Sequence, residues 1–353
     1  MREQDSDVAD VLGIGGIYRD PLWRVTVELT PLERELLRSW WVRRLAFVAH
    51  VGAAAITTVQ TYSRLEHSLG VLALVAHFDP GDACTRVAAL LHDIGHLPMS
   101  HTFEGVAGLD HHQLGSARIA DLATLLDRHG IDTADVHATV EGRRASVLGG
   151  ATPAVLKLDH LDSFVRSGRA HGRTRQPPAM TLRQIQVIDG TVSTDAATAG
   201  YLAELIGAEA RRHCSMANAV PIGVVRHLAT VLLQNAPPTI ADAVAAMTDD
   251  EFWTLLRTDP RTAEPASALR RDPAGWTLGT DDDLTGIEVA VTRLYLDLPL
   301  VDGQILVPER SFVDELPALP WRRTIIPPAH ATSPDSRPDL IIDPDEDLAD
   351  SRG

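Results

Sequence analysis

The stretch that decides the fold runs from residue 64 to residue 104. It begins RLEHSLGVLALVAHF (64–78) and ends TRVAALLHDIGHLPMSHTFE (85–104). Apolar side chains recur in it at helical spacing, in one stripe at 69, 72, 73 and 76 and in a second stripe at 87, 90, 91 and 94. The pattern predicts two amphipathic helices, of which the second ends at Gly95 and Pro98.

Further elements are predicted on both sides of this stretch. The alternation in 23–29, preceded by 15–19, predicts a β-hairpin, and Thr30, Pro31 and Glu33 predict a capped helix start. Asp189-Gly190 predicts a tight turn between two strands within 180–192. Helical patterns recur at 117–126, 134–140, 155–165, 196–230 and 240–256. The sequence therefore predicts a mainly α fold with small peripheral β-hairpins.

Composition divides the chain into four parts. We expect a flexible N-terminus over 1–16, a helical core over 17–235, and a C-terminal accessory region over 236–326. The accessory region is richer in Asp, Pro, Thr and Arg. Residues 327–353 are rich in Pro and Asp and poor in aromatic residues, which predicts a disordered acidic tail.

The charge balance and the apolar runs restrict the expected partners. The 353 residues carry 32 Lys plus Arg against 48 Asp plus Glu, a formal net charge of -16. This field disfavours nucleic acid and anionic membranes, so an anionic substrate would need a metal with nearby Arg and His. Cys84 and Cys214 stand in no CxxC motif. The longest apolar run we identify, around Val87 to Leu91, is too short to span a bilayer, and the N-terminus does not resemble a signal peptide. We expect a cytoplasmic protein without a membrane partner.

Four residues are candidate metal ligands. His92 and Asp93 are neighbours in an apolar segment, where each needs a partner, and a divalent cation suits both side chains. His67 and Asp159 lie on the apolar faces of two other predicted helices. Alone, His67 could be a hydrogen-bonded core histidine and Asp159 a solvated or capping residue. Together, the four predict one divalent metal held between helices of a bundle.

The residues that follow Asp93 are candidates for handling a phosphate. The end of the helix would bring His96 and His101 beside the metal. His101 and Glu104 are three residues apart, so one helical turn would pair them as a proton donor, although such pairs are also common on surfaces. Arg64 lies one turn before His67, and its guanidinium suits a phosphate, unless it is a solvated helix end.

Three motifs, RLEHSLG (64–70), LHDIGHLPMSHTFE (91–104) and KLDHLD (157–162), resemble those of the HD-domain phosphohydrolases. Within that family they are most similar to the deoxynucleoside triphosphate triphosphohydrolase branch, over roughly residues 18–233. The resemblance implies an HD-domain helical bundle that hydrolyses a nucleotide or a related phosphate ester. It implies one divalent cofactor, which could be Mn, Fe, Zn, Ni, Co or Mg, and homo-oligomers formed through helices such as those after Ala196.

The resemblance also implies a role for individual residues. His67, His92, Asp93 and Asp159 match the metal ligands. Arg64 and His96 match groups that touch the phosphates, and His101 with Glu104 matches the catalytic pair. His112 matches a further active-site histidine, with His111 as the alternative because the motif could be shifted by one. Asp162 and Arg166 match positions that flank the substrate.

Two departures from the family bear on the substrate. Ser163 stands where the family usually has an aromatic residue that packs on the sugar, and Ser167 stands where it usually has an acid. We therefore expect altered sugar selectivity in a nucleoside triphosphate hydrolase. The alternatives are a nucleoside mono- or diphosphate phosphatase and a nucleotide-binding regulatory protein without hydrolysis. A nuclease is disfavoured, because the only basic cluster is that at 169, 173, 175 and 183.

Overall fold

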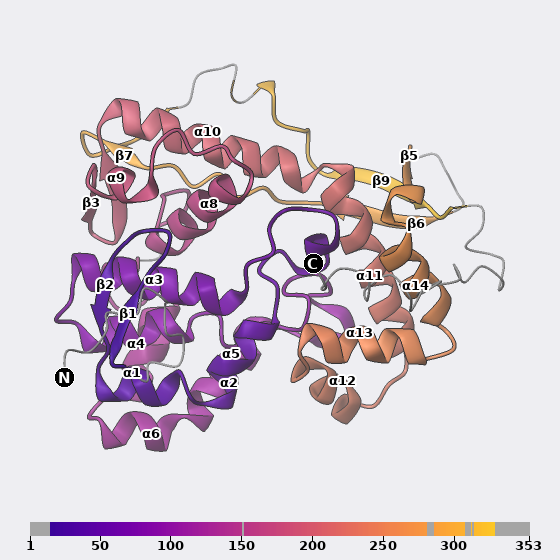
Figure 1. The fold of residues 1–353 in the computed structure, drawn as a ribbon, viewed down its shortest axis with the longest axis horizontal. Coiled ribbons are helices and arrows are strands. Elements are labelled where there is room, and N and C mark those ends of the chain that lie inside the picture. The colour runs from indigo at the N-terminus through magenta and orange to yellow at the C-terminus, as the bar shows by residue number, and fades with distance from the viewer. Residues whose placement is uncertain (1–14, 150–151, 281–285, 308–311, 313, 329–353) are drawn as a thin grey trace, which may run out of the picture.

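The structure is a computed structural model that describes residues 15–149, 152–280, 286–307, 312 and 314–328. Most of the two predicted flexible ends, residues 1–14 and 329–353, lies outside the described residues. Figure 1 shows an elongated molecule in which helices dominate and short strands lie at the periphery. The predicted mainly α fold class is confirmed.

The elements have the following bounds. The helices are α1 (Pro31–Leu36), α2 (Trp40–Arg44), α3 (Arg64–Phe78), α4 (Ala83–Leu91), α5 (His111–Asp121), α6 (Ala123–Arg128), α7 (Thr133–Val140), α8 (Leu158–Ala170), α9 (Pro178–Leu182), α10 (Ala196–His213), α11 (Met216–Leu233), α12 (Pro238–Ala245), α13 (Asp249–Thr258) and α14 (Ala263–Arg271). The strands are β1 (Ile17–Arg19), β2 (Thr26–Glu28), β3 (Ile185–Ile188), β4 (Thr191–Thr194), β5 (Thr277–Gly279), β6 (Ile287–Val291), β7 (Leu300–Val301), β8 (Gln304–Ile305) and β9 (Trp321–Ile326).

One hydrophobic core is built around α3. A capping box of Ser63 and Glu66 starts this helix, and α4 and α8 pack against it. The same core includes the β1–β2 hairpin, with Tyr18 opposite Val27, and the inner face of α10. Because α3 is buried along most of its length, polar side chains on it must find partners inside the protein.

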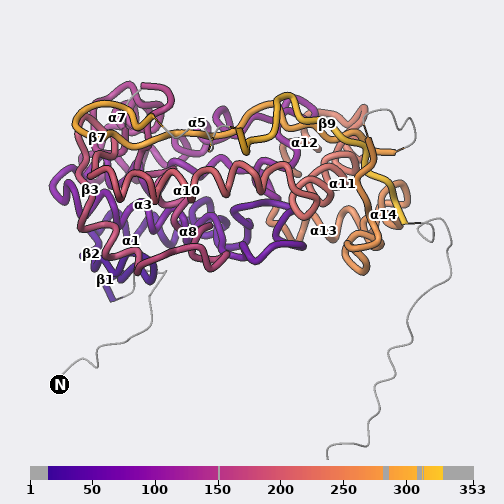
Figure 2. The backbone as a smooth tube through the Cα atoms, turned by 90° about the horizontal axis from the view of Figure 1, so that it is seen from above, coloured from indigo at the N-terminus to yellow at the C-terminus, as the bar shows by residue number. Residues whose placement is uncertain are grey.

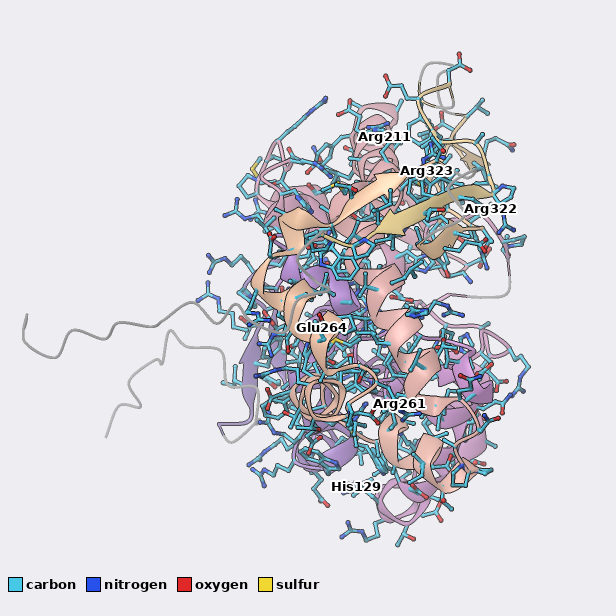
Figure 3. All side chains as sticks on the ribbon, turned by 90° about the vertical axis from the view of Figure 1, so that its right-hand side faces the viewer. His129, Arg211, Arg261, Glu264, Arg322 and Arg323 are labelled. Atoms are coloured by element: carbon cyan, nitrogen blue, oxygen red, sulfur yellow. The ribbon has the colours of Figure 1, made fainter. Side chains whose placement is uncertain are left out.

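A second hydrophobic core joins the accessory region to the loop that follows α4. It contains side chains of α11 to α14 and of the sheet β5-β9-β6, together with Leu97, Met99 and Phe103. Phe103 stacks on Phe252 of α13 at 4.8 Å between ring centroids. Figure 3 views this end of the molecule, where Arg261 donates to backbone carbonyls at the end of α11. The accessory region thus packs directly against the segment that carries the candidate catalytic histidines.

Two buried arginines strengthen this connection. The Arg44 guanidinium donates to the carbonyls of Ala245 and His96, and Arg118 donates to those of Ala245 and Ile94. Each guanidinium therefore joins the end of α12 to the loop after α4. Hydrogen bonds from these two arginine side chains to backbone carbonyls therefore hold the loop at Ile94 and His96, where it has no helical structure of its own.

The boundaries of several elements differ from the predictions. The helix predicted to continue to Gly95 ends at Leu91, and the residues after it form turns. Met99 and Ser100 both have φ near +56°, a left-handed conformation, and residues 101–104 form turns in place of a predicted helical turn. The hairpin turn at Asp189-Gly190 is confirmed, with β3 paired antiparallel to β4. Helix α14 and strand β9 were not predicted, because neither has a long periodic pattern.

Helix α11 is a longer apolar segment than the run around Val87 to Leu91. By length and composition alone, Met216–Leu233 is long and apolar enough to cross a membrane, so the expectation that every apolar segment is too short to do so is wrong. Of this window, 61% is buried inside the protein, and the helix packs in the second core. Those contacts are the ones expected of a core helix.

Candidate metal centre

His67 lies at the centre of the candidate site, on the first turn of α3. Its ring is fully buried, with Nδ1 2.8 Å from Asp162 Oδ2 and Nε2 2.9 Å from Asp159 Oδ1. The same Nε2 lies 3.2 Å from His92 Nε2 and 3.8 Å from Asp93 Oδ2. Residues from three separate segments therefore meet at one nitrogen of His67.

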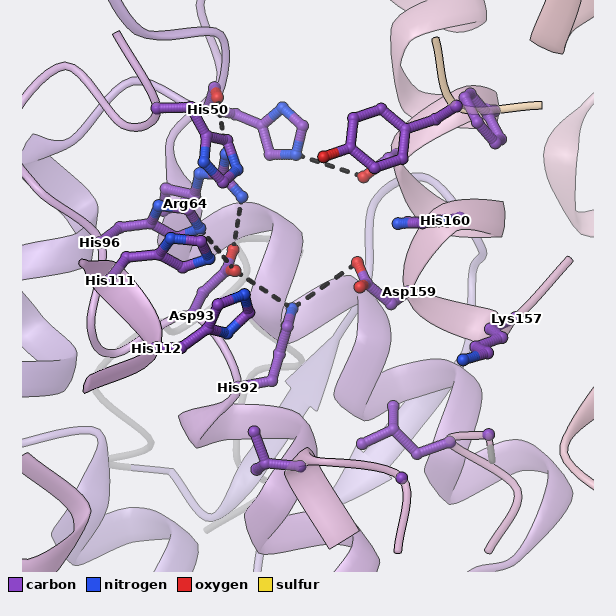
Figure 4. A pocket seen from close by; sticks show the side chains of 18 of the residues that line it. His50, Arg64, His92, Asp93, His96, His111, His112, Lys157, Asp159 and His160 are labelled. Atoms are coloured by element: carbon purple, nitrogen blue, oxygen red, sulfur yellow. Dashed lines mark hydrogen bonds and ion pairs between the residues drawn. The ribbon is translucent and has the colours of Figure 1, made fainter. Parts of the chain in front are cut away.

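His92 and Asp93 complete the cluster from the turn after α4. The Nδ1–H of His92 donates to the Ala89 carbonyl at 2.8 Å, so the lone pair of His92 is on Nε2. That Nε2 lies 3.5 Å from Asp93 Oδ1 and 3.7 Å from Asp159 Oδ1 (Figure 4). The structure thus brings together all four predicted ligands.

The chemistry of these donors fits a divalent cation. Each imidazole is fixed by a bond at Nδ1 and turns Nε2 toward the cluster, which is the usual arrangement of ligating histidines. Two carboxylates add the negative charge that a cation would neutralise. Donor separations of 2.9 to 3.8 Å leave room for bonds of about 2.0–2.2 Å to a single ion. Imidazole and carboxylate together suit a first-row transition metal or magnesium, so the site can hold one divalent cofactor.

A proton on His67 competes with that cation. Burial lowers the pKa of His67, but the hydrogen bonds with Asp159 and Asp162 outweigh it and raise the pKa to about 9. The protein without metal therefore keeps a proton on Nε2, and metal binding must displace it.

The displaced proton gives a pH dependence with a definite sign. We expect the affinity of the metal-depleted protein for Mn²⁺ to rise about tenfold per pH unit between pH 6.5 and 8.5, since both values lie below the raised pKa of His67. Titration with Mn²⁺ at three pH values, followed by electron paramagnetic resonance of the free ion, measures this slope. An affinity independent of pH would contradict the assigned role of the His67 proton.

Asp162 and Arg166 support His67 from behind. Asp162 is fully buried and accepts hydrogen bonds from His67, from Trp23 Nε1 at 2.7 Å and from Arg166 at 2.9 Å. Neither Asp162 nor Arg166 lines the cavity beside the metal cluster. The His67–Asp162–Arg166 chain points into the first core, and the substrate contacts expected of Asp162 and Arg166 stay a prediction.

Gly70 packs so closely against Asp162 and Arg166 that it leaves no room for a larger side chain. A Cβ at Gly70 would lie 2.2 Å from Asp162 Oδ1 and 2.3 Å from the Arg166 guanidinium. We expect Gly70→Ala to displace Asp162 and to weaken metal binding about 10- to 100-fold. It should also lower the free energy of unfolding by about 1–3 kcal/mol.

Gly200→Ala is the matched control for Gly70→Ala. A Cβ at Gly200, on α10, would meet nothing within 4 Å, so this helical substitution should leave metal affinity unchanged. Metal titration and urea unfolding measure both variants. Equal metal affinities for the two would show that Asp162 does not position His67.

Arg64 forms its side-chain hydrogen bonds with Asp93 of the cluster and with residues around it. Its guanidinium donates to Asp93 Oδ2 at 2.9 Å, to Ser100 Oγ and to the His50 carbonyl, and only 6% of the residue is exposed. It lines the cavity, but its hydrogen bonds hold Asp93 and the following loop. The predicted phosphate contact of Arg64 would have to be made in addition to these bonds.

Three imidazoles form a second group next to the metal cluster. His96 Nε2 lies 3.0 Å from Asp93 Oδ1, and the His96 ring stacks on His111 at 4.7 Å and meets His101 edge-on at 4.5 Å. Burial, with the nearby Arg64 charge, lowers the pKa of His96 to about 3, and burial also lowers the pKa of His101. All three rings offer nitrogens within 4.8 Å of one another. However, stacked rings direct their in-plane lone pairs in parallel, so His96 and His111 cannot converge on one ion.

Glu104 is the carboxylate nearest to His111, and the predicted pairing of His101 with Glu104 stays a prediction. Glu104 Oε2 lies 3.1 Å from His111 Nδ1, and Glu104 Oε1 accepts the backbone N–H of His111 at 2.9 Å. Residues 101–104 form turns rather than an α-helix, with the Glu104 N–H donating to the His101 carbonyl at 3.2 Å. His111, the alternative in the sequence, is therefore the histidine beside Glu104, and His112 lies next to it with its ring at 3.9 Å.

A cavity of about 460 Å³ opens beside both groups (Figure 4). Its lining includes His92, Asp93, Asp159 and the three imidazoles, together with His112. Several lining residues were not predicted: His50, Lys157, His160, Glu209, His213, Arg293 and Tyr295. Lys157 and His160 flank Asp159 within its motif, which is the one signal that could have identified them. The others come from segments without a motif.

Ser163 and Ser167, the two departures from the family motifs, both contact polar side chains. Ser163 Oγ lies 3.2 Å from His50 Nε2, and Ser167 donates to Glu209 Oε2 at 2.5 Å. The carboxylate beside Ser167 therefore comes from α10, in a region that the sequence motifs do not cover.

Comparisons with known proteins agree with this geometry. Residues 64–177 match the model of the HD domain. A metal-dependent phosphohydrolase of Cordyceps militaris is 27% identical over 265 residues, which are 68% of this chain and 73% of that protein. An uncharacterised protein of Methanocaldococcus jannaschii is 32% identical over 46% of this chain, and the alignment spans 36% of that longer relative.

Two further similarities are more limited. A deoxynucleoside triphosphate triphosphohydrolase of Xenopus laevis is 29% identical over 104 residues, covering 25% of this chain and 16% of that protein. The crystal structure of a phosphohydrolase from Bacteroides thetaiotaomicron has a TM-score of 0.57 at 16% identity, over 76% of this chain and 79% of that chain, and so shares the fold. Residues 64–177, which match the HD domain, supply the metal cluster at the centre of this fold, and the chain is similar to metal-dependent phosphohydrolases.

Proposed function

We propose that the protein is a metal-dependent phosphohydrolase that acts on nucleotides, with a nucleoside triphosphate as its preferred substrate. The observation that carries the proposal is the convergence of His67, His92 and Asp159, with Asp93 3.5 Å from His92 and 3.8 Å from His67, beside an imidazole-lined cavity. The volume of about 460 Å³ lies within the range of ligand pockets and can hold a molecule the size of a nucleotide.

When bound, the cation would supply Lewis-acid chemistry to a phosphoryl group and to water. The chain supplies the remaining functions. Neutral imidazoles at His96 and His101 can donate hydrogen bonds to phosphate oxygens, and the negative charge of a bound phosphate raises their pKa toward the protonated form. Glu104 beside Nδ1 of His111 favours a proton on that nitrogen, so His111 can transfer a proton through Nε2.

The finer choice of a triphosphate rests on two supports. The sequence motifs resemble the triphosphohydrolase branch, and a relative with that name matches over 104 residues. The serines at 163 and 167 favour altered sugar selectivity. A nucleoside mono- or diphosphate phosphatase remains the second candidate, since the same cluster would hydrolyse a shorter phosphate ester.

A hydrolysis screen with product analysis tests the proposal. Ribo- and deoxyribonucleoside mono-, di- and triphosphates are incubated with the protein and each of Mn²⁺, Mg²⁺, Fe²⁺, Co²⁺, Ni²⁺ and Zn²⁺, and the products are separated by ion chromatography. We expect tripolyphosphate from nucleoside triphosphates. Orthophosphate from monophosphates alone would favour the second candidate, and tight nucleotide binding without turnover would favour a regulatory protein.

A further inference from the structure

One wall of the cavity comes from the accessory region. The chain between β6 and β7, residues 292–299, runs along the molecule from the β5-β9-β6 sheet toward β4 (Figure 2). It is fixed near the start of α8, because the Leu298 carbonyl accepts the N–H of Leu156 at 2.9 Å and Leu298 N–H donates to the Ala154 carbonyl. The residues just before Leu298 are therefore held beside the metal cluster.

This segment presents an aromatic ring to the cavity. Tyr295 lines the cavity and is 39% exposed, whereas the lining residue Phe164 is only 6% exposed. The Arg293 guanidinium carbon lies 4.8 Å from the centroid of the Tyr295 ring, and Arg293 also lines the cavity. The pair thus offers a flat and partly apolar surface in an otherwise polar pocket.

The position of this surface relates it to the metal cluster. The Tyr295 ring meets the His160 ring at 5.5 Å and 72°, and His160 is ion-paired with Asp297 of the same segment. His160 is the chain neighbour of Asp159, a candidate metal ligand. The ring is therefore separated from the cluster by one side chain, while His96, His101 and His111 stand on the loop and helix that follow Asp93.

We infer that Tyr295, with Arg293 stacked on it, is a specificity-determining surface that contacts the nucleoside part of the substrate. The inference rests on the proposed function and adds to it the residue that distinguishes a nucleotide from inorganic phosphate. Phosphates are attracted by the cation and the imidazoles, but a nucleobase gains affinity by stacking on aromatic rings and guanidinium groups. Ser163 also lines the cavity, but it has no ring on which a nucleobase or a sugar could pack.

Removal of the ring tests the inference. The measurements are the KM of deoxyadenosine triphosphate and the inhibition constant of inorganic tripolyphosphate, which carries the phosphates without a nucleoside. For Tyr295→Ala we expect KM to rise about tenfold, the size of effect measured when a stacking ring is truncated, with the tripolyphosphate constant changed less than twofold. Tyr295→Phe keeps the ring and should stay close to the unaltered protein.

Two comparisons complete the test. Trp40→Ala removes another exposed ring, 53% exposed and outside the cavity lining, and should change neither constant. An unchanged KM in Tyr295→Ala, or equal changes for both ligands, would overturn the inference. If the unaltered protein hydrolyses no nucleotide, the proposed function fails, and the inference is decided by calorimetric dissociation constants of the same two ligands. The unaltered protein should then bind the nucleotide more tightly than tripolyphosphate, and this difference in affinity should disappear in Tyr295→Ala. Its persistence would overturn the inference.

Discussion

Asp93→Ala is expected to abolish both metal binding and hydrolysis, with a loss in kcat/KM of at least about 10³-fold. Asp93 lies within 4 Å of His67, His92, His96 and Arg64, so its carboxylate joins both ligating histidines to the neighbouring arginine and imidazole. Burial raises the pKa of Asp93, but the charge of Arg64 and the hydrogen bond with His96 outweigh it and hold that pKa well below its usual range. Metal content by plasma mass spectrometry and turnover of the best substrate measure the result.

Loss of fold must be separated from loss of metal in this variant. Removing Asp93 leaves the buried Arg64 guanidinium without its ion pair, which costs about 3–5 kcal/mol in comparable cases. Circular dichroism and thermal unfolding therefore accompany the assay. Asp195→Ala is the control for lost stability, because it removes the exposed carboxylate that caps α10. It should lower the free energy of unfolding by about 1 kcal/mol and leave metal content and activity unchanged. A folded Asp93→Ala protein with full metal content and turnover would refute the proposed mechanism.

His111→Ala is expected to lower kcat about 10²- to 10⁴-fold while the metal content stays at the level of the unaltered protein. The reason is the position of His111, which stacks on His96, contacts Glu104 and lines the cavity. Glu104→Gln should lower kcat as well, because it removes the carboxylate that orients the His111 ring. Steady-state kinetics with parallel metal analysis measures both variants.

A double-mutant cycle distinguishes the two pairings of Glu104. If Glu104 acts through His111, the combined loss in Glu104→Gln/His111→Ala will be much smaller than the sum of the two single losses. The cycle of Glu104→Gln with His101→Ala should be closer to additive. His112→Ala is the neighbouring control and should lose far less activity than His111→Ala. Equal losses at 111 and 112, or coupling of Glu104 with His101 alone, would contradict the geometry.

The metal cluster could be anticipated because its ligands are short-range features of helices. His67 occupies a buried face that the apolar periodicity indicates, Asp159 lies partly exposed on the first turn of α8, and His92-Asp93 is conspicuous in an apolar run. What periodicity could not indicate is the turn that follows. Positive φ at Met99 and Ser100 has no sequence signature, since neither residue is glycine, and beyond these turns Glu104 lies beside His111.

The supporting and lining residues were less accessible to prediction for a different reason. Asp162 and Arg166 were recognised, but their burial against Trp23 depends on a hairpin far away in the sequence. Tyr295 reaches the cavity only because residues 292–299 span two sheets and are hydrogen-bonded at Leu298. Such long-range contacts leave no periodic pattern in the chain.

Anomalous diffraction from crystals soaked in Mn²⁺ tests the central claim most directly. The structure predicts one strong peak enclosed by Nε2 of His67, Nε2 of His92 and the carboxylates of Asp93 and Asp159. A peak located instead among His96, His101 and His111, or no ordered peak in protein that is active with Mn²⁺, would contradict it.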